Sequence, residues 1–246
     1  MTTEWDAATY DRVANPQARW GLSVLDRLPL NGDERVLDAG CGSGRVTEHL
    51  LERLPNGSVV ALDASEAMLA EARRRLARFG DRVEYVRADL QERLPIDQPV
   101  DAILSTATFH WIRDHARLFR NLAAVLKPGG RLVAQCGGKG NIATLERVLA
   151  AMGNTGADRP FASPEETAER LLAAGFTSIE TWLSDEPTRF DPGQPFEDFL
   201  ETVCLREHVA TMAPEDRRAF VHDVAQHMPE PLLDYVRLNI LARRRA

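Results

Sequence analysis

Short apolar runs alternate with longer amphipathic segments over residues 34–136. The runs predict β-strands, and the segments between them predict helices, because their apolar positions recur three or four residues apart. Four strand-then-helix units followed by a fifth strand predict a parallel sheet with helices on both faces. Right-handed crossovers leave few other topologies. The predicted strands are 35–38, 58–62, 82–87, 100–105 and 131–135, and the predicted helices begin near Arg45, Ser65 and Asp114.

Two more strands are predicted after residue 136, with an insertion of two helical stretches between them. The insertion is too long for a hairpin and too short for an independent domain, so we expect a small helical cap over the site. The alternative is that its apolar residues, Phe196, Phe199, Leu200 and Val203, only seal a sheet edge. We expect one domain, 1–246. Its core is expected at about 30–190 and 233–246, and its cap at about 1–20 and 191–230. The two strands predicted after residue 136 are 179–190 and 235–242. The helices predicted in the same part of the chain are 142–152, 164–174, 196–205 and 214–228.

A glycine-rich turn follows the first predicted strand and precedes a helix that starts near Arg45. Glycines permit positive φ and let a ligand approach the backbone, and the helix that follows presents unpaired N–H groups. The glycines are Gly40, Gly42 and Gly44, so the spacing is G-x-G-x-G. A dinucleotide fingerprint would need its third glycine at position 45. Asp38 precedes the turn and would repel a pyrophosphate, so the pattern favours a cationic ligand.

Three aspartates end successive predicted strands: Asp38, Asp63 and Asp89. Open α/β sheets bind ligands at this edge, and an acid after the second strand accepts hydrogen bonds from ribose hydroxyls in nucleotide-binding folds. One such acid is explained by a helix cap. Three acids at one sheet edge favour a binding site. Ser65, just after the second acid, is a candidate N-cap.

The segment Asp38-Ala39-Gly40-Cys41-Gly42-Ser43-Gly44 resembles motif I of the class I methyltransferases that use S-adenosylmethionine (SAM). The resemblance extends over residues 35–136 and includes Asp63–Leu69, the Phe109-His110-Trp111 block and the Lys127-Pro128-Gly129-Gly130 turn. The chain is most similar to the subgroup of trans-aconitate and malonyl-carrier-protein methyltransferases. The resemblance implies an α/β fold with a Rossmann-like, seven-stranded, mostly parallel sheet, helices on both faces and a small helical cap. The alternative is a glycine-rich turn in another Rossmann-like protein.

The resemblance also implies the cofactor and the site. The cofactor is SAM, the product is S-adenosylhomocysteine, and no metal takes part. Met68 would lie beside the adenine, although a core methionine explains it equally well, and Asp89 would accept a hydrogen bond from the adenine amino group. The implied cofactor contacts are Gln17, Asp38, Gly40, Gly42, Gly44, Asp63, Ala64, Met68, Ala88, Asp89, Leu90 and Thr106, and the implied acceptor contacts are Tyr10, Phe109, His110 and Trp111.

His110 is the histidine that the resemblance places near the transferred methyl group. It is either a general base for a phenol, alcohol or amine acceptor, or a hydrogen-bond donor that shapes the pocket. A carboxylate acceptor is already anionic and needs no base. O-methylation of a small carboxylate is therefore one expectation. N- or C-methylation, non-methylating chemistry at a SAM site and a non-catalytic SAM-binding subunit stay open.

Composition and charge restrict the partners. The formal net charge is −7 and the pI is about 5.5, which argues against nucleic acid, because phosphate binding needs a basic surface. The three cysteines are widely spaced, so neither a zinc site nor a disulfide framework is expected. No signal peptide or membrane span is apparent. We expect a cytoplasmic monomer or homodimer that acts on a small-molecule methyl acceptor. Residues 73–75 are expected to be a solvated face, and residues 243–245 a frayed tail.

Overall fold

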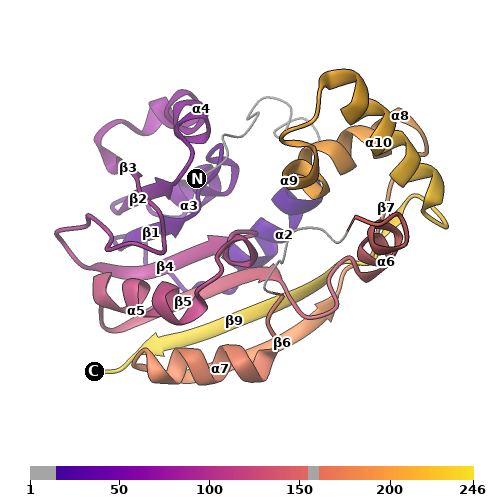
Figure 1. The fold of residues 1–246 in the computed structure, drawn as a ribbon. Helices are drawn as coiled ribbons and strands as arrows, with labels where there is room; N and C mark the ends of the chain where they lie inside the picture. Colours follow the sequence, from indigo (N-terminus) through magenta and orange to yellow (C-terminus); the bar gives the residue numbers. More distant parts are fainter. Residues whose placement is uncertain (1–14, 155–160) are drawn as a thin grey trace.

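The computed structural model describes residues 15–154 and 161–246, and a seven-stranded sheet runs through it (Figure 1). The strand order is β3-β2-β1-β4-β5-β9-β6. Strands β1 to β5 are parallel, whereas β9 is antiparallel to both of its neighbours. The predicted seven-stranded, mostly parallel sheet is therefore confirmed. Its strands are β1 (Arg35–Ala39), β2 (Ser58–Asp63), β3 (Val83–Arg87), β4 (Val100–Thr106), β5 (Leu126–Gly137), β6 (Phe176–Asp185) and β9 (Val236–Arg244).

Both faces of the sheet are apolar, because successive strand residues point to opposite faces and both kinds are hydrophobic. In β2, Val59 and Ala61 join one buried cluster, and Val60 and Leu62 join the other. Helices α2, α3 and α4 complete the first cluster, while α5 and α7 complete the second. Helices on both faces are thus confirmed. Their bounds are α2 (Asn15–Leu25), α3 (Arg45–Glu52), α4 (Glu66–Leu76), α5 (His115–Val125) and α7 (Pro164–Ala173).

One of the four expected strand-then-helix units has no helix. After α4, the chain forms a short 3-10 segment (Ala77–Arg82) and then β3. The whole connection from β3 to β4, residues 88–99, is described and lacks a helix. It contains Pro95 and Pro99, which have no backbone N–H group and interrupt a helical hydrogen-bond pattern. The expectation of a helix after every strand is wrong at this unit.

The C-terminal strands also differ from the prediction. Pro187 interrupts the strand expected over 179–190, so β6 ends at Asp185, and β7 (Thr188–Arg189) pairs instead with β8 (Leu232–Leu233). The frayed tail expected at residues 243–245 is wrong, and the N–H of Arg245 donates to the Gly175 carbonyl at 2.9 Å. Arg243 is paired with Arg131 of β5, and Arg244 with Phe176 of β6.

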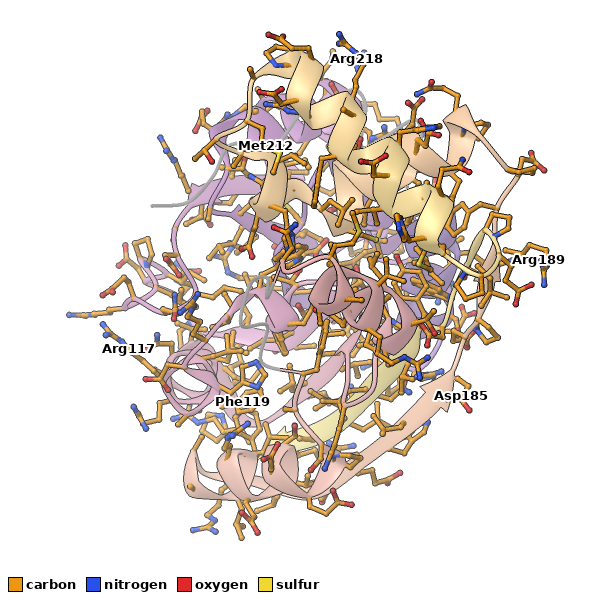
Figure 2. The ribbon with its side chains drawn as sticks, turned by 45° about the vertical axis from the view of Figure 1, so that its right-hand side comes forward. Arg117, Phe119, Asp185, Arg189, Met212 and Arg218 are labelled. Carbon is orange, nitrogen blue, oxygen red and sulfur yellow. The ribbon has the colours of Figure 1, made fainter. Side chains whose placement is uncertain are left out.

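A third apolar cluster holds the helical cap together. The predicted cap residues Phe196, Phe199 and Leu200 are buried in it, and Val203 packs against it. Helix α6 (Ala143–Ala151) joins this cluster as well, although the sequence placed it in the core. Arg218 lies on the outer surface of the cap (Figure 2). The cap elements are α8 (Gln194–Phe199), a π-helical turn (Leu200–Cys204), α9 (Arg206–Val209) and α10 (Pro214–His227).

Candidate active site

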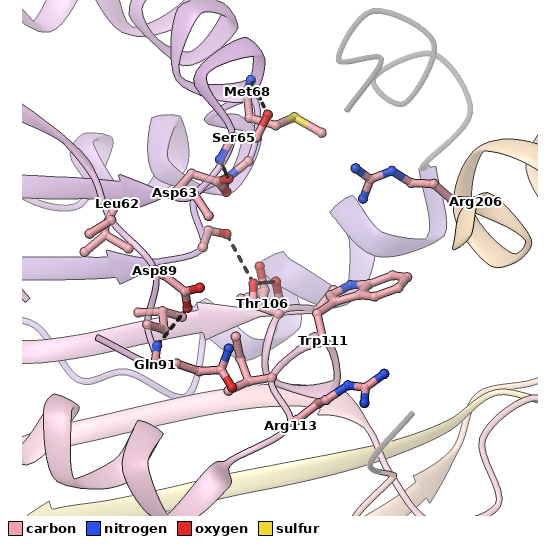
Figure 3. A pocket seen from close by; sticks show the side chains of 18 of the residues that line it. Leu62, Asp63, Ser65, Met68, Asp89, Gln91, Thr106, Trp111, Arg113 and Arg206 are labelled. Atoms are coloured by element: carbon pink, nitrogen blue, oxygen red, sulfur yellow. Dashed lines mark hydrogen bonds between the residues drawn. The ribbon is translucent and has the colours of Figure 1, made fainter. Parts of the chain in front are cut away.

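A cavity of about 540 Å³ opens at the carboxyl ends of the strands, with α9 of the cap across from them (Figure 3). Open α/β sheets bind ligands at this edge, and the volume is typical of small-molecule sites. The cap contributes to the wall through Arg206 and Glu207. Ten of the predicted site residues also line the cavity: Gly40, Gly42, Asp63, Ala64, Met68, Ala88, Asp89, Leu90, Thr106 and Trp111.

The glycine turn brings backbone to the cavity at Gly40 and Gly42. Gly40 has φ +88°, and a Cβ there would lie 2.2 Å from Oγ1 of Thr108. Gly42 has φ +54°, and a Cβ there would meet no atom within 4 Å, so this residue faces open space. Gly44 does not line the cavity, because it caps α3 and faces Ala72 and Leu76 of α4. Its positive φ of +82° serves helix packing.

Asp63 ties the glycine turn to the end of β2. One carboxylate oxygen accepts a hydrogen bond from the Gly42 backbone N–H at 2.9 Å, and the other accepts one from the Ser65 N–H at 2.9 Å. Each carboxylate oxygen can accept more than one hydrogen bond. Ser65 also accepts a hydrogen bond from the Met68 N–H at 3.3 Å, which confirms it as the N-cap of α4.

The third acid forms the next part of the wall. Oδ1 of Asp89 accepts a hydrogen bond from the Gln91 N–H at 2.9 Å, which fixes the loop after β3. Met68 and Leu90 contribute apolar surface nearby, and each is almost fully buried. This side of the cavity therefore combines two carboxylates with a methionine and a leucine, a wall suited to a polar ring system with hydroxyl groups.

Asp38 lies behind the turn rather than in the wall. It is 1% exposed, and one of its oxygens accepts a hydrogen bond from Thr47 Oγ1 at 2.6 Å. Burial raises the pKa of this carboxyl to about 7; the bond from Thr47 opposes the rise, and the nearby charge of Asp63 adds to it. Among the described atoms, its second oxygen has no hydrogen-bond partner. A cation in the cavity would stabilise its charged form.

The predicted acceptor block has three different placements. Trp111 lines the cavity. Phe109 does not, because it is 1% exposed and packs edge-on against Phe119 in the core, with ring centroids 6.0 Å apart. Its predicted acceptor contact needs correction. His110 is also buried outside the wall, and its Nδ1 accepts a hydrogen bond from the Gly137 N–H at 3.3 Å.

This placement of His110 favours a structural role. The imidazole stacks on Phe161, with centroids 6.2 Å apart, and lies 5.1 Å from the Trp111 ring. The contact to Gly137 holds the end of β5 beside the loop after β4. At this contact Nδ1 of His110 accepts a hydrogen bond, which leaves Nε2 as the donor nitrogen of a neutral ring.

Two predicted residues, Tyr10 and Gln17, have no described side chain. Tyr10 lies outside the described residues. Gln17 lies in α2, but its side chain is not described. Several wall residues were not predicted as site residues: Leu62, Ser65, Gln91, Ala107, Thr108, Ile112, Arg113, Arg206 and Glu207. Ser65 and Gln91 could have been found as neighbours of Asp63 and Asp89. The two cap residues reach the wall only through the tertiary fold.

The comparisons with known proteins agree with this geometry. A "methyltransferase domain" family matches residues 36–130. The trans-aconitate 2-methyltransferase of Methylobacterium nodulans is 36% identical over 74% of this chain and 67% of its own length. The chain belongs to the class I SAM-dependent methyltransferases, in the subgroup of trans-aconitate 2-methyltransferases. The Escherichia coli relative of that name is 27% identical over 98% of this chain and 99% of its own. Other such relatives match over 49% to 62% of their length.

A solved structure shares the fold of this methyltransferase. Phosphoethanolamine N-methyltransferase 2 of Haemonchus contortus, in complex with phosphomonomethylethanolamine and S-adenosylhomocysteine, superposes with a TM-score of 0.66. It is 21% identical, and the match covers 97% of this chain and 56% of that one.

The cavity of this methyltransferase fits SAM as its cofactor. The acids Asp63 and Asp89 line the wall, and Asp38 lies buried behind it; a phosphate-bearing cofactor would be repelled there, whereas a cationic one is favoured. Gly42 leaves open space where a ligand approaches the backbone. In the described part of the chain, no group of histidine, cysteine or acidic residues could hold a metal ion. No described helix is long and apolar enough to cross a membrane.

Proposed function

We propose that this enzyme transfers the methyl group of SAM to a carboxylate oxygen of a small-molecule acceptor. One observation carries the proposal: among the described residues, the cavity wall contains no histidine, lysine, tyrosine or cysteine. A carboxylate is ionised at neutral pH and needs no base, whereas an alcohol or a protonated amine must lose a proton. The name of the trans-aconitate 2-methyltransferase relatives supports a carboxylic acid as the acceptor.

The cofactor contacts in this proposal follow from the wall. Asp63 would accept hydrogen bonds from the ribose hydroxyls, and Asp89 would accept one from the adenine amino group. Met68 and Leu90 would pack against the adenine ring, because both present apolar surface there. Asp38 would balance the positive charge of the bound cofactor from behind the turn. When bound, SAM supplies a methyl group on a positively charged sulfur, and the sulfur becomes a neutral thioether when an acceptor oxygen takes the methyl group.

The chain itself contributes alignment and exclusion of water. Trp111 and Ile112 form the apolar part of the wall on the acceptor side, next to the loop that ends β4. Holding two reactants in line is worth roughly 7–11 kcal/mol in favourable cases. The reaction joins an anion to a cationic methyl donor and yields two neutral groups, so a dry, apolar wall favours it. Among the described wall residues, none is required to move a proton.

Two measurements test this function. Calorimetric titration with S-adenosylhomocysteine should give micromolar binding, and titration with NADH should give none. Incubation with SAM and trans-aconitate should then release S-adenosylhomocysteine and form a product that mild alkali hydrolyses, because methyl esters are saponified and N- or C-methyl groups are not. A product that resists alkali would refute carboxylate methylation and favour the N- or C-methylation alternative. Tight binding of S-adenosylhomocysteine without turnover on any acceptor would point to a binding subunit or to non-methylating chemistry.

A further inference from the structure

Trp111 and Ile112 reach the cavity wall from a single short turn of the chain. The turn is the 3-10 helix Phe109–Trp111, and such helices have poorer hydrogen-bond geometry than α-helices. The Trp111 N–H donates to the Thr108 carbonyl at 3.0 Å, and the Ile112 N–H donates to the Phe109 carbonyl at 2.9 Å. Two backbone bonds hold a turn weakly, so the place of the Trp111 ring in the wall depends on the contacts at the two ends of the turn.

The chain before the turn is attached to the sheet. Ala107 lines the cavity and has φ +56°, a left-handed conformation that costs energy in residues other than glycine. Such residues persist where the surrounding structure fixes them, and they cluster at binding sites. The Ala107 N–H donates to the Gln135 carbonyl of β5 at 2.8 Å, and Oγ1 of Thr108 donates to the Thr106 carbonyl at 3.0 Å. These contacts fix the first end of the turn.

A buried histidine holds the other end. His115 is the first residue of α5 and is 4% exposed, and its Nε2 lies 2.9 Å from the Phe109 carbonyl oxygen. A carbonyl oxygen only accepts, so Nε2 carries the proton and donates this bond. The rings of Phe109 and His115 also pack against Phe119 of α5, with centroids 6.0 Å and 5.9 Å from it. Helix α5 therefore fixes the turn through one hydrogen bond and two ring contacts.

The surroundings of His115 keep its imidazole neutral. Burial lowers the pKa of this group, and the bond to the Phe109 carbonyl opposes the change. Among the described atoms, its buried Nδ1 has no hydrogen-bond partner, so a proton there would be an N–H group without an acceptor. A neutral imidazole has a single N–H donor. His115 is thus a buried titratable group outside the cavity wall, and its one donor binds the turn that carries Trp111.

We propose that His115 is a positioning residue for methyl transfer: it holds the Phe109 carbonyl so that the Trp111 ring stays in the cavity wall on the acceptor side. This inference rests on the proposed function. Transfer requires the acceptor oxygen in line with the bond between methyl carbon and sulfur, and a small displacement of a positioning group lowers the rate. His115 does not line the cavity, so it acts only through the turn.

The test uses two side chains of similar length that differ in one hydrogen-bond donor. His115→Gln keeps an amide N–H that can reach the Phe109 carbonyl, whereas His115→Met has no donor and fills the space with a flexible apolar chain. His227→Met is the matched control. The exposed imidazole of His227 also contacts a backbone carbonyl, that of Asp223 at 2.7 Å, but it lies outside the cavity wall. The full chains are assayed with SAM and trans-aconitate, and S-adenosylhomocysteine binding is measured by calorimetry.

A second readout follows Trp111 without any reaction. The chain has four tryptophans, and labelling with 5-fluorotryptophan gives each of them a fluorine resonance. The resonance that is missing in Trp111→Phe belongs to Trp111. His115→Met should shift or broaden this resonance and leave the others in place. A general loss of stability would not select one tryptophan.

The kinetic effect should be moderate and specific. His115→Met should lower kcat/KM for trans-aconitate by about 3- to 10-fold, the loss expected for one hydrogen bond between neutral groups. Its S-adenosylhomocysteine affinity should change by less than about twofold, because Asp63 and Asp89 are not altered. His115→Gln should recover most of the activity and the wild-type Trp111 resonance, and His227→Met should match wild type in every measurement.

Three outcomes would overturn the inference. The first is an unchanged Trp111 resonance in His115→Met. The second is a shifted resonance with unchanged kcat/KM, which would make the contact a matter of folding alone. The third is an equal loss of activity or of folding in His115→Met and His115→Gln, which would exclude the hydrogen bond as the cause. Failure of the proposed function has a different signature: wild-type enzyme would bind S-adenosylhomocysteine without methylating trans-aconitate, while the Trp111 resonance would still respond to His115→Met, and the role in methyl transfer would fall.

Discussion

Replacing Asp38 by asparagine removes a charge that the fold buries behind the glycine turn. The carboxyl is 1% exposed, and burial raises its pKa from 3.8 to about 7. Thr47 donates one hydrogen bond to it, and an asparagine oxygen can accept the same bond. The substitution therefore changes the charge and the protonation of this position while it keeps shape and one contact.

The sign of the effect follows from proton binding. Between pH 4 and 7, the folded protein keeps a proton on Asp38 that the unfolded chain has released, so the free energy of unfolding falls as pH rises. The pKa difference of roughly three units corresponds to about 4 kcal/mol, at about 1.4 kcal/mol for each unit. This stability is present below the unfolded pKa and is lost as pH approaches 7. Asparagine does not titrate, so the Asp38→Asn variant escapes this loss.

Urea unfolding of both proteins from pH 4 to pH 8, without cofactor, measures the effect. The free energy of unfolding of Asp38→Asn minus that of wild type should rise by up to about 4 kcal/mol across this range and then stay constant. The difference between the two proteins cancels the titration of every other group and any pH-independent cost of the amide. S-adenosylhomocysteine should show the complementary behaviour: its ammonium group favours the charged carboxylate, so wild-type affinity should fall below pH 7 and the affinity of the variant should not.

Parallel stability curves for the two proteins between pH 4 and pH 8 would refute this reasoning. They would mean that Asp38 titrates alike in the folded and unfolded chains, and that its burial carries no electrostatic cost. Equal pH dependence of S-adenosylhomocysteine binding in both proteins would separately refute the coupling to the cofactor.

Three further substitutions, one of them with a control variant outside the site, test other parts of the structure. Asp63→Ala should weaken S-adenosylhomocysteine binding by about 1.5–3 kcal/mol in calorimetry, because charge-assisted hydrogen bonds are lost; unchanged affinity would remove Asp63 from the cofactor site. Gly40→Ala should lower the free energy of unfolding in urea by about 2–4 kcal/mol, because an alanine there has a strained left-handed backbone and a Cβ 2.2 Å from Thr108. Gly129→Ala has the same kind of backbone strain, at φ +75°, but open space around its Cβ, so it should cost only about 1 kcal/mol. His110→Asn should leave S-adenosylhomocysteine affinity within about twofold and retain turnover of a carboxylate acceptor within about tenfold, and complete loss of turnover with normal binding would restore His110 as a base.

The sheet and the acidic side of the cavity could be predicted because their causes are local. Apolar runs form strands wherever both faces are buried, and the glycine spacing reports a tight backbone approach. Asp63 is the last residue of β2, and Asp89 comes two residues after β3, so the parallel arrangement alone brings them to one edge. The errors near Pro187 arose where a single residue without an N–H group overrides an otherwise regular pattern.

The cap side of the cavity could not be predicted from the sequence. Arg206 lies 95 residues after Trp111 in the sequence, and its place in the wall depends on a π-helical turn and on apolar contacts of the cap. Phe109 and His110 lie outside the cavity wall for a related reason. Both belong to a motif beside the cavity, but a short 3-10 helix, Phe109–Trp111, turns only Trp111 toward it.

The position of β9 in the sheet has a consequence for the order of assembly. This strand is the last of the sheet to leave the ribosome, yet it lies between β5 and β6, which are synthesised earlier. Until Val236–Arg244 has emerged, β6 has no strand to pair with, and the sheet to which the cap segment is connected is incomplete. The nascent chain can therefore complete the nucleoside side of the cavity from β1 to β4 well before it completes the acceptor side. A stalled or C-terminally clipped chain would keep the strand ends that hold the cofactor but lose the support that places the cap over them.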